Sequence, residues 1–122
     1  MKISFDYDGT FTDPKIREIA KSLLDKHEVF ILTCRFGDNM REVYLLAEKV
    51  GIKRENVLCT NLKDKGDYIL ENNLQFDIHF DDDYFDVDSI NNKTKTSAFL
   101  VDLTLHPNNT RITDGGLIVP KN

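Results

Sequence analysis

The chain has few cysteines and no long hydrophobic run. Only two of its 122 residues are cysteines, Cys34 and Cys59, too few for a disulfide framework or a zinc cluster. No apolar stretch approaches the ~20 residues that span a bilayer. Charged side chains at Lys2 and Asp6 interrupt the segment that would be apolar in a secretory signal. We therefore expect a cytoplasmic protein with reduced thiols and no membrane partner.

The chain also lacks an excess of basic residues. It carries 16 Lys and Arg against 21 Asp and Glu, a formal net charge of −5. This balance predicts no extended surface for duplex DNA or an anionic membrane. Part of the acidity is local, because residues 81–88 contain five aspartates.

The pattern of apolar residues predicts one domain, residues 1–122, in which strands alternate with helices. Asp13 and Pro14 are typical of a helix start, as N-cap and first helical residue. The predicted strands are 3–5, 29–32, 57–59, 76–80 and 98–101, and the predicted helices are 14–27, 38–50 and 64–72. Residues 91–97 are polar and predict a loop, whereas 117–119 could add a strand or a dimer contact. This order favours an α/β, three-layer Rossmann-like fold with a mostly parallel central sheet.

Polar residues gather where the predicted strands end. Asp6, Asp8, Thr33 and Asp81 all fall at or just after carboxyl ends of strands, where ligands bind in open sheets of this kind. Asp6 and Asp8 are two residues apart, so we expect both carboxylates on the same side of the chain. Converging carboxylates indicate a site for a hard cation, a nucleophile and a proton donor.

Four short patterns resemble the motifs of the haloacid dehalogenase (HAD) superfamily, whose members are mostly magnesium-dependent phosphate hydrolases. The Asp-Tyr-Asp-Gly-Thr run at 6–10 resembles motif I, and the apolar strand ending in Thr33 resembles motif II. Lys65 is similar to the motif III lysine, with Lys63 as the alternative. The apolar run before Asp81 and Asp82 resembles motif IV, so the resemblance covers about residues 1–83 in the family's order.

The resemblance implies a sheet with strand 1 in the middle, in the order 5-4-1-2-3. Most members of the family carry a cap domain after motif I or between motifs II and III. Here helix 14–27 and strand 29–32 fill nearly all of the first interval, and one helix and one strand fill the second. We therefore expect a capless member, whose open site would suit a bulky phosphorylated substrate such as a protein or nucleic-acid end. A homo-oligomer partner could also cover the site.

The resemblance also implies the roles of the catalytic residues. Asp6 would be the nucleophile that forms an aspartyl-phosphate, and Asp8 would protonate the leaving group and then activate water. Thr33 and Lys65 would hold the phosphoryl oxygens. Arg35 could reach the phosphate, with a surface role equally open.

A magnesium ion completes the expected site. Two unit charges ~4 Å apart repel by ~4 kcal/mol at an effective dielectric near 20, so gathered carboxylates need a counter-cation. Mg²⁺ accepts oxygen ligands and commonly keeps several waters. The expected ligands are Asp6, the backbone carbonyl of Asp8, and Asp81, with Asp82 as a direct or water-mediated alternative.

Other functions stay open beside a phosphatase. A regulatory or non-catalytic protein that binds phosphate or metal is the main alternative, although the presence of both Asp6 and Asp8 favours catalysis. Cys34 has no histidine nearby in the sequence, so a catalytic thiol is not expected. His79 is interpreted as a packed side chain, not a ligand. The remaining aspartates of the 81–88 run, Asp83, Asp86 and Asp88, are interpreted as a solvated acidic loop.

Overall fold

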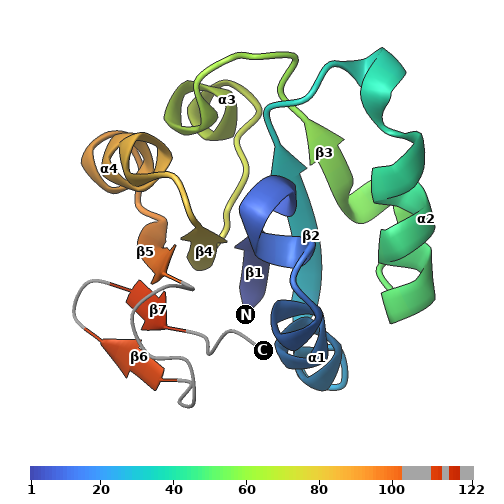
Figure 1. Cartoon of the computed structure of the whole chain (residues 1–122). Coiled ribbons are helices and arrows are strands. Elements are labelled where there is room, and N and C mark those ends of the chain that lie inside the picture. The colour runs from blue at the N-terminus through green and yellow to red at the C-terminus, as the bar shows by residue number, and fades with distance from the viewer. Residues whose placement is uncertain (103–110, 114–115, 119–122) are drawn as a thin grey trace.

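The computed structural model describes residues 1–102, 111–113 and 116–118 of the chain. Within this described part, seven strands form a single sheet in the order β3-β2-β1-β4-β5-β7-β6 (Figure 1). The strands are β1 (Lys2–Phe5), β2 (Glu28–Thr33), β3 (Val57–Cys59), β4 (Ile78–Asp81), β5 (Ser97–Asp102), β6 (Arg111–Thr113) and β7 (Gly116–Ile118).

Helices cover both faces of this sheet (Figure 1). They are α1 (Pro14–Leu23), α2 (Arg41–Val50), α3 (Lys65–Glu71) and α4 (Tyr84–Lys93). Helices α1 and α2 pack on one face, and α3 and α4 pack on the other. None of the helices in the described part of the chain has both the length and the apolar character needed to cross a membrane.

The first five strands are all parallel, as the alternation of strands and helices predicts. These five strands lie in the order β3-β2-β1-β4-β5. The expected order, 5-4-1-2-3, counts the strands from the opposite edge of the sheet and contains only five of them. The sheet differs from that expectation because β7 pairs parallel with β5, and β6 pairs antiparallel with β7. Leu117 and Ile118 belong to β7, and Val119 lies outside the described residues.

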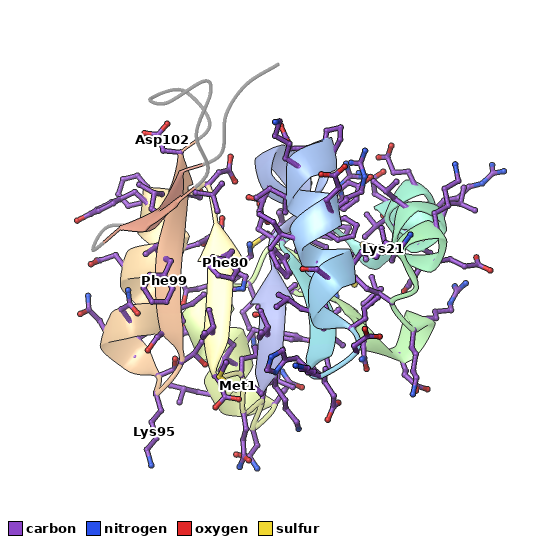
Figure 2. The ribbon with its side chains drawn as sticks, turned by 90° about the horizontal axis from the view of Figure 1, so that it is seen from below. Met1, Lys21, Phe80, Lys95, Phe99 and Asp102 are labelled. Atoms are coloured by element: carbon purple, nitrogen blue, oxygen red, sulfur yellow. The ribbon has the colours of Figure 1, made fainter. Side chains whose placement is uncertain are left out.

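Alternating side chains of the strands form the two cores. Ile3 and Phe5 of β1 face α1 and α2, together with Phe80 of β4 and Phe99 of β5. Phe80 and Phe99 are register partners whose ring centroids lie 6.0 Å apart (Figure 2). The intervening position of β1, Ser4, is buried as well.

The acidic segment after β4 starts a helix, so the interpretation of Asp83, Asp86 and Asp88 as a loop is wrong. Asp83 caps α4, because its carboxylate accepts a hydrogen bond from the Phe85 N–H at 2.8 Å. Val87 and Ile90 bury the helix against the sheet. The predicted loop at 91–97 therefore begins only after Lys93, and Asp88 is an exposed helical residue.

Smaller differences concern the ends of elements. The helix expected at 14–27 ends at Leu23, and the one expected from residue 38 begins at Arg41, after a turn over Gly37–Asn39. Asp13 and Pro14 start α1 as predicted, since the Asp13 carboxylate accepts a hydrogen bond from the Lys15 N–H at 2.8 Å.

Candidate active site

Three neighbouring strands bring the expected site residues to one edge of the sheet. Phe5 of β1 is in register with Ile31 of β2 and Phe80 of β4. Asp6 follows β1, while Thr33 and Asp81 end β2 and β4. A pocket of about 450 Å³ lies at this edge. It is lined by Asp6, Asp8, Thr33, Cys34, Arg35, Phe36, Asn39, Leu62, Lys65, Asp81, Asp82, Asp83 and Asp86.

A buried lysine joins two of the aspartates. The Nζ atom of Lys65 lies 2.7 Å from Asp6 Oδ1 and 2.6 Å from Asp81 Oδ2, and the side chain is 1% exposed. Asp64 caps α3, so Lys65 is the first residue of the helix and points into the site. Lys63 precedes the cap and pairs at the surface with Glu71. Of the two candidate lysines, Lys65 therefore lines the pocket.

One ammonium group shared by two buried carboxylates leaves a negative charge uncompensated. Burial raises the pKa of Asp6 well above its ordinary value; Lys65 opposes this rise, and repulsion from Asp81 adds to it. Burial by itself would lower the pKa of Lys65, but Asp6 and Asp81 outweigh burial and raise it. Lys65 therefore stays charged, and the site favours a further cation beside Asp6.

A buried histidine orients Asp81. His79 Nε2 lies 2.8 Å from Asp81 Oδ2, and His79 Nδ1 lies 2.7 Å from Ser4 Oγ. Burial lowers the pKa of His79, so the ring is neutral. Its Nε2–H then donates a hydrogen bond to Asp81, and its Nδ1 accepts one from the Ser4 hydroxyl. Burial opposes ionisation of Asp81, but the bond from His79 and the charge of Lys65 lower its pKa overall. His79 is packed, as expected, and also fixes the direction of the Asp81 carboxylate.

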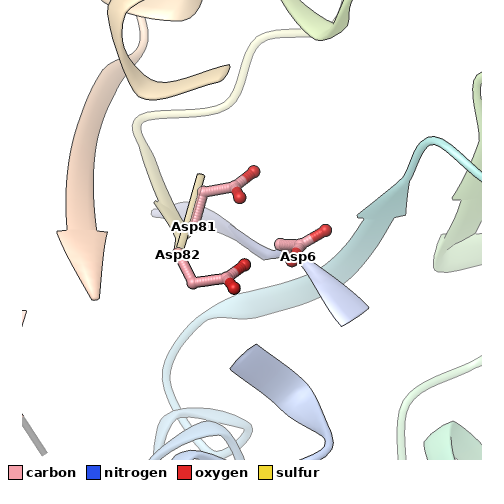
Figure 3. Close-up of side chains that lie close together, drawn as sticks. All are labelled: Asp6, Asp81 and Asp82. Atoms are coloured by element: carbon pink, nitrogen blue, oxygen red, sulfur yellow. The ribbon is translucent and has the colours of Figure 1, made fainter. Parts of the chain in front are cut away.

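Three carboxylates lie close enough to hold a metal ion. Among the described residues, Asp6, Asp81 and Asp82 each offer an oxygen atom within 4.8 Å of the others (Figure 3). The set consists only of carboxylate oxygens, which are the ligands that Mg²⁺ takes in proteins. The Asp82 carboxylate also accepts a hydrogen bond from Thr10 Oγ1 at 3.4 Å. The residues present therefore fit a hard divalent cation.

The turn after β1 requires glycine at position 9. Gly9 has φ +79°, and a Cβ atom added there would lie 2.8 Å from Cγ of Asp82. The turn thus brings its backbone against the Asp82 carboxylate, which only a residue without a side chain allows.

We expect Gly9→Ala to displace Asp82 and to weaken Mg²⁺ binding by ~10–100-fold, the usual effect of disturbing the support of a ligand. Gly51→Ala is the matched control, because Gly51 has φ +106° and lies at the end of α2. Both variants should lose ~1–2 kcal/mol of unfolding free energy from left-handed strain. Calorimetric titration with Mg²⁺ should separate them; equal Mg²⁺ affinities would contradict the contact with Asp82.

Asp8 has a different partner from Asp6. The Arg35 guanidinium donates to both Asp8 oxygens, at 2.7 Å from Nη2 and 2.9 Å from Nε. Arg35 also donates to the Asn39 carbonyl at 3.1 Å and to Glu42, and lies 5.0 Å from the centroid of the Tyr7 ring. The hydrogen bonds from Arg35 lower the pKa of Asp8. Asp6 and Asp8 therefore line the same pocket but have different cationic partners, Lys65 for Asp6 and Arg35 for Asp8.

The pocket holds more acid than base. Six of its lining side chains are carboxylates and two are cationic, Arg35 and Lys65, an excess of four negative charges when all are ionised. Burial raises the pKa of Asp86 to about 6, with repulsion from Asp81 and Asp83 adding to the rise and Lys65 opposing it. When its acidic groups are ionised, this pocket repels an anion such as a phosphate dianion.

Sequence reasoning missed the role of Asp86. This residue lies in the first turn of α4, and its Oδ2 atom is 3.6 Å from Lys65 Nζ. The signal in the sequence was Asp83, which is a typical N-cap residue. A helix that begins after Asp83 has Asp86 in its first turn. Phe36, Asn39 and Leu62 also line the pocket, although no motif marks them.

No protein-family model matches the chain, and no curated protein or solved structure matches it either. The resemblance to the HAD superfamily therefore stays an expectation from the motif residues.

Proposed function

We propose that the protein is a magnesium-dependent phosphate monoester hydrolase of the capless HAD type, acting through an aspartyl-phosphate on Asp6. The observation that carries the proposal is the Asp6 carboxylate at the end of β1, bonded to Lys65 and grouped with Asp81 and Asp82. Thr33 lines the same pocket. The described segments between Asp6 and Lys65 form α1, β2, α2, β3 and short turns, which supports the absence of a cap.

Asp6, Asp81 and Asp82 would hold the Mg²⁺ ion, with the expected help of the Asp8 carbonyl. When bound, Mg²⁺ supplies positive charge that lets a phosphate dianion enter a pocket rich in carboxylates. Lys65 already occupies one oxygen of Asp6 and one of Asp81, so it fixes both carboxylates before substrate arrives.

The first chemical step transfers the phosphoryl group to Asp6. An Asp6 oxygen forms a bond to phosphorus while the bond from phosphorus to the leaving oxygen breaks, and Asp8 gives that oxygen a proton. Thr33 and Lys65 donate hydrogen bonds to the phosphoryl oxygens, where charge develops in the transition state.

The second step releases phosphate. Asp8, now a carboxylate, takes a proton from water, and the resulting oxygen attacks phosphorus as its bond to Asp6 breaks. Inorganic phosphate leaves, and Asp6 and Asp8 return to their starting states.

The pair between Asp8 and Arg35 has to open for this cycle. A phosphoryl group offers the guanidinium two oxygens in the same geometry as a carboxylate. When Arg35 exchanges Asp8 for the phosphate, Asp8 loses the contacts that lower its pKa, so it more readily holds the proton that it gives to the leaving oxygen. Through this exchange Arg35 would bind the phosphate and Asp8 would act as the acid, which are the roles expected from the sequence.

We expect Arg35→Lys to raise KM for the phosphate ester by about tenfold or more, because lysine cannot donate the paired bonds of a guanidinium. Arg41→Lys is the matched control, since Arg41 is exposed at the start of α2. Steady-state kinetics on both variants check the prediction, and an unchanged KM in Arg35→Lys would show that Arg35 stays with Asp8 during turnover.

A non-catalytic protein that binds phosphate or metal is the second candidate. One observation favours it: Asp8 is held as a carboxylate by two hydrogen bonds from Arg35. Such a protein would bind Mg²⁺ and phosphate without turnover.

A phosphatase screen with Mg²⁺ or with EDTA distinguishes the two candidates. It should cover sugar phosphates, nucleotides, and phosphorylated protein and nucleic-acid ends, with release of inorganic phosphate as the readout. Turnover that requires Mg²⁺ would support the hydrolase. Mg²⁺-dependent phosphate binding without release from any ester would support the second candidate.

A further inference from the structure

Two apolar side chains line a pocket that is otherwise mainly charged and polar. Phe36 follows Arg35 in the loop after β2, and Leu62 lies in the loop after β3. Phe36 is 50% exposed and Leu62 is 65% exposed, so both present hydrocarbon to solvent at the opening of the site. Exposure of large apolar groups beside a binding pocket indicates a ligand surface.

The exposed apolar residues concentrate at this end of the molecule. Seven large hydrophobic residues of the described chain are exposed, and four of them follow strands β2, β3 and β4: Phe36, Leu62, Tyr84 and Phe85. Tyr84 and Phe85 begin α4 and do not line the pocket. They therefore provide a control for apolar exposure without contact to the site.

Hydrogen bonds between the two loops hold Phe36 and Leu62 in place. The Leu62 N–H donates to the Cys34 carbonyl at 2.8 Å, and the Gly37 N–H donates to the Asn61 side chain at 2.8 Å. Leu62 has φ +66°, a left-handed conformation uncommon outside glycine. Such conformations persist where the surrounding structure enforces them, often at ligand sites.

The position and size of the pocket indicate which part of a substrate meets this surface. Phe36 adjoins Arg35, whose partner Asp8 is the proposed acid for the leaving group. The pocket volume of about 450 Å³ lies within the ~300–1,000 Å³ of small-molecule sites. Phe36 and Leu62 thus border the leaving-group side of a pocket suited to a small molecule.

We infer that Phe36 and Leu62 form a subsite for a flat ring on the leaving group, so the preferred substrates are ring-bearing phosphate monoesters of small size. A nucleoside monophosphate and an aryl phosphate share this chemistry, because every base and aryl group has a π face that stacks on Phe36. The inference rests on the proposed hydrolase, and it narrows the bulky substrates expected from the open site to small esters that carry a ring.

The test compares adenosine 5′-monophosphate with ribose 5-phosphate. Both have a primary leaving oxygen, but only the nucleotide carries the flat adenine base. We expect kcat/KM to favour the nucleotide by about fivefold or more, which is the smallest factor that stacking of one base contributes. Phe36→Ala should remove most of this ratio, and Phe85→Ala should leave it unchanged. Benzyl phosphate compared with ethyl phosphate, whose leaving alcohols differ little in acidity, tells whether a simple aryl ring suffices.

Leu62→Gly separates a binding role from a structural one. Glycine relieves the left-handed conformation, so this variant should unfold at a higher temperature and yet lose part of the ring preference. A preference that survives in Leu62→Gly and in Phe36→Ala would overturn the subsite. Loss of preference in Phe85→Ala, or activity confined to 5′-phosphorylated oligonucleotides, would place recognition on a larger surface and also overturn it.

Binding measurements keep this test apart from the test of hydrolysis. In calorimetric titrations with Mg²⁺, the wild-type protein should bind adenosine 5′-monophosphate more tightly than ribose 5-phosphate, and Phe36→Ala should lose most of this difference in affinity. If no ester is hydrolysed but the nucleotide binds more tightly through Phe36, the hydrolase proposal fails and the subsite stands. Equal binding of the two phosphates to the wild-type protein overturns the subsite, whatever the turnover.

Discussion

Replacing Asp6 by Asn is expected to lower kcat by at least about 10³-fold while the protein stays folded. Loss of one stabilising group from a transition state already costs ~10²–10³-fold, and an amide cannot form the aspartyl-phosphate at all. The amide keeps the size of the carboxylate, and Lys65 retains Asp81 as a partner at 2.6 Å. The folded state should therefore survive.

The matched control for Asp6→Asn is Asp88→Asn, an exposed aspartate of α4 outside the pocket. Phosphate release and thermal unfolding should be measured for both variants. Beryllofluoride should raise the unfolding temperature of the wild-type protein by bonding to Asp6 as a mimic of the phosphoenzyme. It should not change the unfolding temperature of Asp6→Asn. Full turnover in Asp6→Asn would exclude Asp6 as the nucleophile.

The arrangement of the strand ends could be predicted from the sequence because it depends on short-range pattern. Apolar runs of 3–6 residues alternate with amphipathic helices, and this order requires parallel strands whose carboxyl ends meet at one edge. Asp6, Thr33 and Asp81 each follow directly on such a run. Their common pocket follows from topology, without knowledge of any side-chain contact.

The choice between Lys63 and Lys65 depended on a helix boundary. Sequence patterns locate helix ends only to within a few residues, and the two lysines are two positions apart. The Asp64 carboxylate accepts a hydrogen bond from the Asp67 N–H at 3.0 Å, and this bond fixes where α3 begins. Lys65 consequently falls inside the helix and in the pocket.

Side-chain partners from distant segments could not be predicted. The pair of Asp8 with Arg35 joins positions 27 residues apart, and the chain from Ser4 through His79 to Asp81 joins two strands. These contacts depend on strand register and rotamers, which no local pattern encodes. Helix α4 was missed because aspartate and asparagine, its commonest residues, have weak helix propensity, and burial of Val87 and Ile90 outweighs that propensity.

Replacing Lys65 by Met is expected to have the largest effect on stability, a loss of ~3–5 kcal/mol in the free energy of unfolding without Mg²⁺. The Lys65 ammonium is buried between Asp6 and Asp81, so its removal leaves two facing carboxylates without their cation. Lys63→Met should change stability little, because Lys63 pairs with Glu71 in solvent.

The double variant Asp6→Asn/Lys65→Met shows whether the loss comes from charge. It should be more stable than Lys65→Met alone, because only Asp81 of the two carboxylates bound by Lys65 then remains charged.

Mg²⁺ should stabilise Lys65→Met more than it stabilises the wild-type protein, since the metal then supplies the missing positive charge. Phosphatase activity of Lys65→Met should still be ~10²–10³-fold lower with saturating Mg²⁺, because the hydrogen bonds to the phosphoryl oxygens are lost. Thermal unfolding with and without Mg²⁺ measures the differences in stability, and release of inorganic phosphate measures the difference in activity. A double variant less stable than Lys65→Met would mean that Lys65 acts by packing and not by its charge.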